Sequence, residues 1–442
     1  MKRHELTRRG FIRASAAAAL PFIIPASVLG DNAPSQRITM GFIGTGNNGT
    51  DWMRDFMRDE RVQVVAVCDV NTEGPGYWDG TIRGREPARR IVEEFYGGRS
   101  CAAYEDFRDV IERKDIDAVY IATPDHWHAI IAIAAANAKK DIFCQKPLSL
   151  TIAEGRAMSN AVKRNKVVFQ TGSQQRSDTK FRKACEYVRS GRIGKVKTIK
   201  VGLPGVNWEK EGLPPRFPDS EPPPELDYDL WLGPAPWRPY NQRRVHYFFR
   251  FFWDYSGGQM TNWGAHHLDI AQWGLGTDQS GPIEITGTAT YNAENYYETP
   301  QRFQATYKYA DGTTLLCSSG TGKYRGGTLF EGEKGSIFVT RGSIESTPDE
   351  ILEEPLGSDA VRLYASSDHY QNWLECIKSR KEPVCSVETG HRSATVCHLG
   401  NIAIRTGRKV NWDPMTEQIV GDKELAQWIS RPYRAPWKLP LA

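Results

Sequence analysis

Several kinds of sequence pattern are missing from this chain of 442 residues, and each absence argues against a class of protein or of binding site. Its eight cysteines include no C-x-x-C pair, which argues against a zinc site or a disulfide framework and favours buried thiols. The formal net charge is only +4, which argues against nucleic acid as the partner. No internal repeat or low-complexity tract is evident, so we expect about two globular domains.

Residues 1–30 differ in composition from the rest of the chain. The sequence TRRGFIR at residues 7–13 precedes an apolar run at residues 14–26, and small residues follow near position 30. This order is typical of a twin-arginine export signal, and a basic membrane-anchoring helix is the alternative. The run is too short to span a bilayer stably. We therefore expect a signal peptide, a twin-arginine translocase as partner during export, and a mature protein in the periplasm.

Residues 38–69 contain an apolar strand, a glycine turn, a helix, a second apolar strand and a terminal acid. In such a turn Gly44 permits the tight bend, Gly46 lets the backbone approach a pyrophosphate, and Gly49 lets the helix pack closely on the strand. Asp69 would accept hydrogen bonds from the ribose hydroxyls of NAD and repel a 2′-phosphate, so NAD is favoured over NADP. A simple glycine-rich strand-to-helix turn is the alternative. The predicted cofactor-binding residues of the turn are Gly44, Thr45, Gly46, Asn47, Asn48 and Gly49.

Strands and helices continue to alternate after Asp69. Apolar strands are predicted at residues 118–123, 141–144 and 167–171, with helices at residues 129–138 and 153–163. This alternation predicts an α/β fold with a doubly wound parallel sheet. Ligands of such sheets bind at the carboxyl ends of the strands, so two further segments should face the cofactor. These segments contribute Thr123, Pro124, His128, Gln145 and Lys146 to the predicted cofactor site.

The pattern changes after residue 171. A helix at residues 179–190, a strand at 196–201 and a proline-rich aromatic stretch at 203–240 precede five predicted strands between residues 283 and 340. Short strands in succession, with an Asp311-Gly312 hairpin turn, predict a second domain with a mostly antiparallel sheet. Two helical segments follow this sheet, at residues 369–379 and 393–406.

A second group of polar residues lies in the segment GGQMTNWGAHHLD at residues 257–269. On one helix Asn262, His266 and Asp269 would share a face, so Asp269 could fix the tautomer of His266 or raise its pKa. A core histidine bonded to backbone is the alternative, and His267 fits it better than His266. The histidines at positions 126, 128, 266 and 267 form two close pairs, but no nearby carboxylate or cysteine completes a metal site, so no metal is predicted.

These motifs resemble those of the Gfo/Idh/MocA oxidoreductases, which include glucose–fructose oxidoreductase and inositol dehydrogenase. The resemblance extends from GTGNNG at residues 44–49 through TPDHWH and CQKP to the segment at residues 257–269, and it is greatest for an exported subgroup. It implies an N-terminal Rossmann dinucleotide-binding domain, a C-terminal α+β domain with an open antiparallel sheet, and a homodimer or homotetramer. We accordingly expect a Rossmann NAD-binding domain at residues 37–165, a substrate and oligomerisation domain at 166–360, and C-terminal helices and a tail at 361–442.

The resemblance also implies roles for single residues. Lys146, from the family's E-K-P motif, would touch both the reacting hydroxyl and the nicotinamide ribose, and His266 would be the acid/base. A sugar or polyol would bind between the nicotinamide and the sheet. Two positions depart from the family's pattern, because Gln145 replaces a glutamate and Asn262 an aspartate. If these amides approach Lys146, its pKa should fall, which makes it a better proton acceptor near pH 7.

We therefore predict an NAD-dependent oxidoreductase that moves a hydride between a hydroxyl-bearing carbon of a sugar, polyol or glycoside and a nicotinamide. Lys146 would stabilise the developing alkoxide, and Asn262 would orient the hydroxyl or His266. NADP is the alternative cofactor. Tight binding of the cofactor is expected, because no free NAD pool exists outside the inner membrane.

Two other functions fit the same residues. One is a glycosidase that works by transient oxidation, elimination and re-reduction, and the other is a non-catalytic exported sugar-binding protein. The tentative substrate contacts could equally be packing residues or ion pairs. They are Gln174, Arg176, Trp231, Trp253, Asp254, Tyr255, His267 and Asp269.

Overall fold

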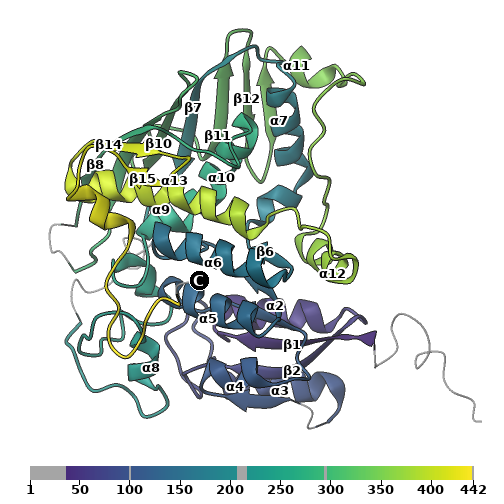
Figure 1. Ribbon diagram of the computed structural model, residues 1–442, viewed down its shortest axis with the longest axis vertical. Coiled ribbons are helices and arrows are strands. Elements are labelled where there is room, and N and C mark those ends of the chain that lie inside the picture. The colour runs from purple at the N-terminus through teal and green to yellow at the C-terminus, as the bar shows by residue number, and fades with distance from the viewer. Residues whose placement is uncertain (1–35, 99–100, 207–216, 293–295, 441–442) are drawn as a thin grey trace, which may run out of the picture.

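The structure is a computed structural model that describes residues 36–98, 101–206, 217–292 and 296–440. The predicted twin-arginine segment lies outside these residues. Two sheets form the framework, one in the lower half and one in the upper half of the view in Figure 1. Helices α6 and α13 pack against each other where the two domains meet. The expected order of a parallel-sheet domain followed by a second sheet domain is confirmed.

The first sheet has six strands in the order β3-β2-β1-β4-β5-β6, and every neighbouring pair is parallel. The strand order reverses between β1 and β4, and this switch point opens a crevice at the carboxyl ends of the strands. The strands are β1 (Ile38–Ile43), β2 (Val62–Cys68), β3 (Ala102–Tyr104), β4 (Ala118–Ile121), β5 (Asp141–Cys144) and β6 (Phe169–Thr171). Between them run α2 (Asn47–Met57), α3 (Arg85–Tyr96), α4 (Phe107–Glu112), α5 (Asp125–Asn137) and α6 (Ile152–Asn165).

The second sheet has nine strands in the order β13-β12-β11-β7-β10-β9-β8-β14-β15. All neighbouring pairs are antiparallel except β7 and β10, which are parallel. Its strands are β7 (Val196–Leu203), β8 (Glu284–Thr290), β9 (Arg302–Lys308), β10 (Thr314–Ser319), β11 (Gly327–Gly332), β12 (Ser336–Val339), β13 (Ile344–Thr347), β14 (Val410–Asp413) and β15 (Gln418–Ile419).

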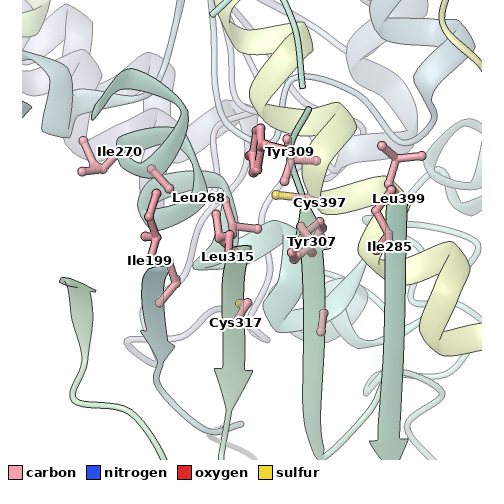
Figure 2. Packing of buried hydrophobic residues seen from close by; sticks show 14 of the residues in the cluster. Ile199, Leu268, Ile270, Ile285, Tyr307, Tyr309, Leu315, Cys317, Cys397 and Leu399 are labelled. Atoms are coloured by element: carbon pink, nitrogen blue, oxygen red, sulfur yellow. The ribbon is translucent and has the colours of Figure 1, made fainter. Parts of the chain in front are cut away.

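Helices cover one face of this second sheet. Figure 2 shows Leu268 of α10 and Leu399 of α13 packed over Ile199, Leu315 and Ile285 of the strands, all buried. The helices that follow β6 in the chain are α7 (Thr179–Arg189), α8 (Tyr228–Leu232), α9 (Gly258–Asn262), α10 (Gly264–Leu275), α11 (Glu350–Glu353), α12 (His369–Ser379) and α13 (Val387–Thr406), with 3-10 turns η3 (Gln174–Ser177), η5 (Phe248–Phe251) and η6 (Leu425–Ile429).

All eight cysteines are buried and unpaired, as their spacing predicts. Burial raises the pKa of several of them, so they behave as small apolar side chains. Among the described residues, no helix is both long enough and apolar enough to cross a membrane.

The chain crosses the predicted domain boundaries at three places. β6 joins the first sheet after the predicted boundary at residue 165, and β14 and β15 extend the second sheet beyond residue 360. Trp373 of α12 is fully buried in the first domain, edge-on to Phe56 and Phe143. The C-terminal region is therefore not a separate layer, because its apolar side chains complete the cores of both domains.

The helix predicted around Asn262 is divided in the structure. α9 ends at Asn262 and α10 begins at Gly264, with Trp263 between them. Asn262 and Asp269 therefore lie on two different helices and do not share one helix face. The Asp269 carboxylate accepts three hydrogen bonds from the buried guanidinium of Arg176, at 2.7–3.0 Å. This ion pair corrects the prediction that Arg176 and Asp269 contact substrate, because both side chains are sealed in the core.

Replacing Asp269 by asparagine tests the structural role of this pair. Asp269→Asn leaves the Arg176 charge buried with less compensation, so we expect a loss of about 3–5 kcal/mol in the free energy of unfolding, measured by urea denaturation. The control is Glu345→Gln, which breaks an exposed pair with Arg325 and should leave the midpoint unchanged. Equal shifts in the two variants would contradict the assignment.

Candidate active site

A cavity of about 300 Å³ lies at the switch point of the first sheet and reaches the second domain. This volume is at the lower end of the range typical of small-molecule sites. Its walls come from the glycine turn, from the ends of β2, β4 and β5, and from segments around α8, η5 and α9. Of the residues predicted from sequence, it is lined by Gly44, Gly46, Asn47, Asn48, Asp69, Thr123, Pro124, Gln145, Lys146, Trp231 and Asn262.

The glycine turn has the geometry needed to hold a pyrophosphate. Gly44 has φ +90°, which permits the bend, and a Cβ on Gly49 would lie 1.8 Å from the carbonyl oxygen of Gly44. In the described chain no side chain caps the start of α2, so its first N–H groups are available to an anion. The residues present therefore fit a dinucleotide at this turn.

Asp69 stands at the end of β2 on the wall of the cavity. Its Oδ2 accepts hydrogen bonds from the backbone N–H (2.7 Å) and the hydroxyl (3.2 Å) of Thr45, and its Oδ1 accepts one from the Asn71 N–H at 2.9 Å. Thr45 thus fixes the carboxylate from behind rather than lining the cavity. Burial raises the pKa of Asp69 and these hydrogen bonds oppose the rise. A 2′-phosphate would face this carboxylate, which favours NAD.

Gln145 connects β5 to the glycine turn rather than to Lys146. Its Nε2 donates to the hydroxyl of Tyr120 at 2.6 Å, and that hydroxyl donates to Oδ1 of Asn48 at 3.1 Å. An amide suits this chain because it can donate to Tyr120, whereas a carboxylate could only accept. Gln145 is therefore a positioning residue for both strand ends.

His128 lies behind the cavity wall, where it holds two loops together. Its Nδ1 lies 2.9 Å from the carbonyl oxygen of Pro147, and its Nε2 lies 2.9 Å from that of Thr123. These carbonyls belong to the loops that follow β5 and β4, so the ring fixes the spacing between them. His128 does not line the cavity, which corrects its prediction as a cofactor-binding residue.

Lys146 marks the end of the cavity next to the second domain. Its ammonium donates to the side-chain oxygen of Asn262 at 2.9 Å and to the backbone oxygen of Asn262 at 3.0 Å. The pKa of Lys146 is lowered to about 8, mainly by burial and also by the positive charges of Arg250 and Arg341, while the Asp125 carboxylate opposes the fall. The expected fall in pKa is therefore present, with burial as its main cause. The amine is partly unprotonated near neutral pH.

His266 lies next to this end of the cavity without lining it. Its ring is buried, and within the described chain its Nδ1 has no hydrogen-bond partner. Burial and the nearby charge of Lys146 place the pKa of His266 well below its usual value, so the ring is neutral at pH 7. Since Asp269 binds Arg176, it does not fix the His266 tautomer, which corrects that prediction.

The other tentative substrate residues lie away from this cavity. Gln174 donates to the hydroxyl of Tyr370 at 3.0 Å, and His267 stacks on Trp263. Tyr255 is fully buried against the rings of His126 and Trp231. Trp253 and Asp254 line a separate cavity. These positions correct the predicted substrate contacts, because none of the five side chains lines the cavity at the glycine turn.

Sequence reasoning missed an aromatic cover over the glycine turn. The rings of Tyr77 and His246 lie 4.6 Å apart, and so do those of Trp78 and Tyr247. All four, together with Arg250, line the cavity. They come from irregular segments with no periodicity, so only their density of aromatic residues could have pointed to them.

The comparisons with known proteins agree with this architecture. Residues 38–173 match the family model of the oxidoreductase family's NAD-binding Rossmann fold, and residues 177–439 match its C-terminal alpha/beta domain, in the Gfo/Idh/MocA family. The N-terminal domain is therefore an NAD-binding Rossmann domain.

Individual relatives match over shorter stretches. Myo-inositol 2-dehydrogenase of Thermotoga maritima is 32% identical over 162 residues, which are 37% of this chain and 44% of that protein. A glycosyl hydrolase family 109 protein of Stenotrophomonas maltophilia is 27% identical over 248 residues, 54% of this chain and 50% of that protein. The chain thus matches about half or less of the length of these curated relatives.

Solved structures share the fold across most of the chain. Aldose-aldose oxidoreductase from Caulobacter crescentus, complexed with glycerol, superposes with a TM-score of 0.61 at 19% identity, covering 85% of this chain and 99% of that one. Two family models together span almost all of the described residues. The chain belongs to the Gfo/Idh/MocA family of oxidoreductases.

Proposed function

We propose that this protein is an NAD-dependent oxidoreductase acting on a hydroxyl of a sugar, polyol or glycoside. The observation that carries the proposal is the buried Lys146 ammonium at the end of the cavity, with a pKa of about 8, next to the neutral ring of His266. A proton acceptor with a pKa near the working pH is what oxidation of an alcohol requires. The likeness to myo-inositol 2-dehydrogenase supports a polyol or sugar as substrate.

When bound, NAD supplies the hydride acceptor. The chain's residues deal with the proton and the charge. The unprotonated amine of Lys146 accepts the hydroxyl proton, and the resulting ammonium stabilises negative charge on the substrate oxygen. Asn262 holds the Lys146 Nζ through two oxygens, which fixes the direction from which the amine meets the hydroxyl. His266 does not line the cavity, so its neutral ring acts through Lys146, as a relay for the proton that the amine has taken from the hydroxyl.

The proposal includes a tightly held cofactor. The C-terminal segment at residues 431–439, here called the strap, crosses from the second domain to the first. Arg434 of the strap donates to backbone oxygens of Asp229 (2.8 Å) and Gly233 (2.9 Å) on either side of the cavity residue Trp231. The ring of Trp437 packs edge-on against Trp127, which also lines the cavity, at 4.7 Å. The strap therefore braces one wall of the dinucleotide site.

Export and assembly belong to the same proposal. The TRRGFIR segment supports twin-arginine export of an already folded, cofactor-loaded protein to the periplasm. A braced cofactor suits that compartment, since a dissociated NAD could not be replaced there. Membership of the family supports a homodimer or homotetramer.

A second candidate is glycoside cleavage with no net redox change. It is favoured by the match of 248 residues to a glycosyl hydrolase family 109 protein. The two candidates need the same residues, so they are separated by their products. The test is to mix the purified mature protein, without added cofactor, with a panel of sugars, polyols and glycosides. A lasting rise in reduced-nicotinamide absorbance indicates the dehydrogenase, whereas a released aglycone without that rise indicates the glycosidase. Neither signal, from protein that retains NAD, would favour a binding protein.

Substitution of the two acceptors tests the mechanism. Lys146→Met and His266→Gln should each lower kcat by roughly 10²–10⁴, because each removes a group that takes or stabilises the transferred proton. The matched control is His267→Gln, which changes the neighbouring buried histidine whose ring stacks on Trp263 and whose pKa, unlike that of His266, is not affected by Lys146, so kcat should stay nearly unchanged. If the His267 variant loses as much activity as the His266 variant, the assignment is wrong.

The pH dependence of oxidation should follow the unprotonated amine of Lys146. The rate should be low below pH 8 and level off above it, because only the unprotonated form accepts a proton. Asn262→Asp places a carboxylate next to Lys146 and favours the ammonium, so the rise in kcat/KM should move roughly 1 pH unit higher. An unchanged profile in the Asn262 variant would argue against Lys146 as the base.

The strap predicts cofactor retention. Trp437→Ala should release NAD during gel filtration and restore activity only when NAD is added, with kcat at saturating NAD close to that of the parent protein. The control is Trp237→Ala, because Trp237 is 66% exposed. NAD content is measured in the protein peak after denaturation. Full retention by the Trp437 variant would contradict this role.

A further inference from the structure

A second cavity, of about 280 Å³, lies on the other side of the segment that precedes α9. Its walls come from the start of α6, the residues before Gly257, the C-terminal half of α13 and the turn η6. Trp253 and Asp254 line this cavity and not the dinucleotide cavity. The oxidoreductase mechanism therefore uses neither the cavity nor these two residues.

Arg405 of α13 is the central cation of the second cavity. Its guanidinium lies 4.3 Å from the ring centre of Trp253 and 4.7 Å from that of Trp428, so two indoles hold it in place. Within the described chain it makes no hydrogen bond and no ion pair. Burial and the charge of Arg431 lower the pKa of Arg405 to about 10, which still leaves it charged at pH 7. The two indoles thus fix the guanidinium, while its N–H groups donate to no acceptor within the described chain.

Arg431 adds a second positive charge to the same cavity. It donates to the backbone oxygen of Trp253, and burial lowers its pKa. The nearby carboxylates are already bound elsewhere. Asp254 and Glu298 both pair with Arg238, and Glu154 accepts from the hydroxyl of Tyr433. These carboxylates lie near the two arginines, but in the described chain none of them forms an ion pair with Arg405 or Arg431.

Two buried acceptors face this cavity without a partner in the described residues. Nε2 of His398 and Oδ1 of Asn401 are both unbonded, and these side chains are 7% and 6% exposed. The Asn401 amide nitrogen donates to the carbonyl of Gly257 at 2.9 Å, so its oxygen is fixed. Burial lowers the pKa of His398 to about 3, and the ring also bonds the Ser149 backbone, which leaves Nε2 as an acceptor. Both groups need a hydroxyl donor.

We propose that the second cavity binds a sugar acid, with Arg405 and Arg431 holding the carboxylate and Asn401 and His398 accepting hydroxyl hydrogens. A guanidinium pair suits a carboxylate, because its N–H groups match two oxygens. The two acceptors distinguish a polyhydroxy acid from a simple anion. The cavity volume suits a ligand of monosaccharide size. This site does not depend on the oxidoreductase reaction.

Calorimetric titration of the mature holoprotein with D-glucuronate tests the proposal. We expect saturable binding that D-glucose and inorganic sulfate do not reproduce. Arg405→Gln should weaken it at least roughly 10-fold, since a charge-assisted hydrogen bond is lost. The matched control is Arg408→Gln, whose exposed side chain pairs with Asp422 and Glu424 at the same helix end and should bind like the parent. Thermal unfolding and NAD content confirm that each variant is folded.

A Lys146→Met variant separates the two cavities. It should bind D-glucuronate as the parent does, even if turnover is lost, because Lys146 does not line the second cavity. Loss of binding in this variant, with binding kept in the folded Arg405 variant, would assign the ligand to the dinucleotide cavity and overturn the proposal. Equal affinity for sulfate would contradict the proposal, because the cavity would then bind anions in general. Equal affinity for D-glucose would show that the arginines do not recognise a carboxylate. If no saturable heat were observed, the cavity would not be a binding site for a sugar acid.

Discussion

The contact between Lys146 and Asn262 is the constraint on which the arrangement of the site depends. Lys146 lies two residues after the end of β5 in the first sheet, and Asn262 is the last residue of α9 in the second domain. Two oxygens of one residue hold the ammonium, so the cavity has a fixed end only when both domains are in place. Burial of that end lowers the pKa of Lys146, and the same burial keeps His266 neutral. The chemistry thus follows from the packing of the two domains.

The first domain could be predicted from sequence because its signals are local. The glycine turn needs φ values and close approaches that Gly44 and Gly49 supply, and the apolar strands are separated by helices of ordinary length. The same holds for Asp69, directly after β2, and for Lys146, two residues after the end of β5, since both lie at the carboxyl edge of the sheet. Because the sheet topology fixes where the strand ends lie, the location of residues at these ends can be predicted from the sequence.

The errors concern contacts between distant segments. Arg176 and Asp269 are 93 positions apart, and nothing in their surroundings shows that they neutralise each other in the core. The break at Trp263 is equally hidden, because residues on both sides have helical patterns. The aromatic cover of Tyr77 and His246 joins two irregular segments. Local periodicity describes which face of an element is apolar, but not which partner meets that face.

The neutral amides at positions 145 and 262 act through different partners. Asn262 meets Lys146 and brings no negative charge, so the effect of burial is offset only in part, by Asp125, and the pKa of the amine is about 8. Gln145 instead donates to Tyr120, whose hydroxyl reaches Asn48 in the glycine turn. A carboxylate at 145 would have to accept from that hydroxyl, and the link to Asn48 would then be lost. Asn262 therefore affects the pKa of the Lys146 amine, whereas Gln145 links the end of β5 to the glycine turn through Tyr120.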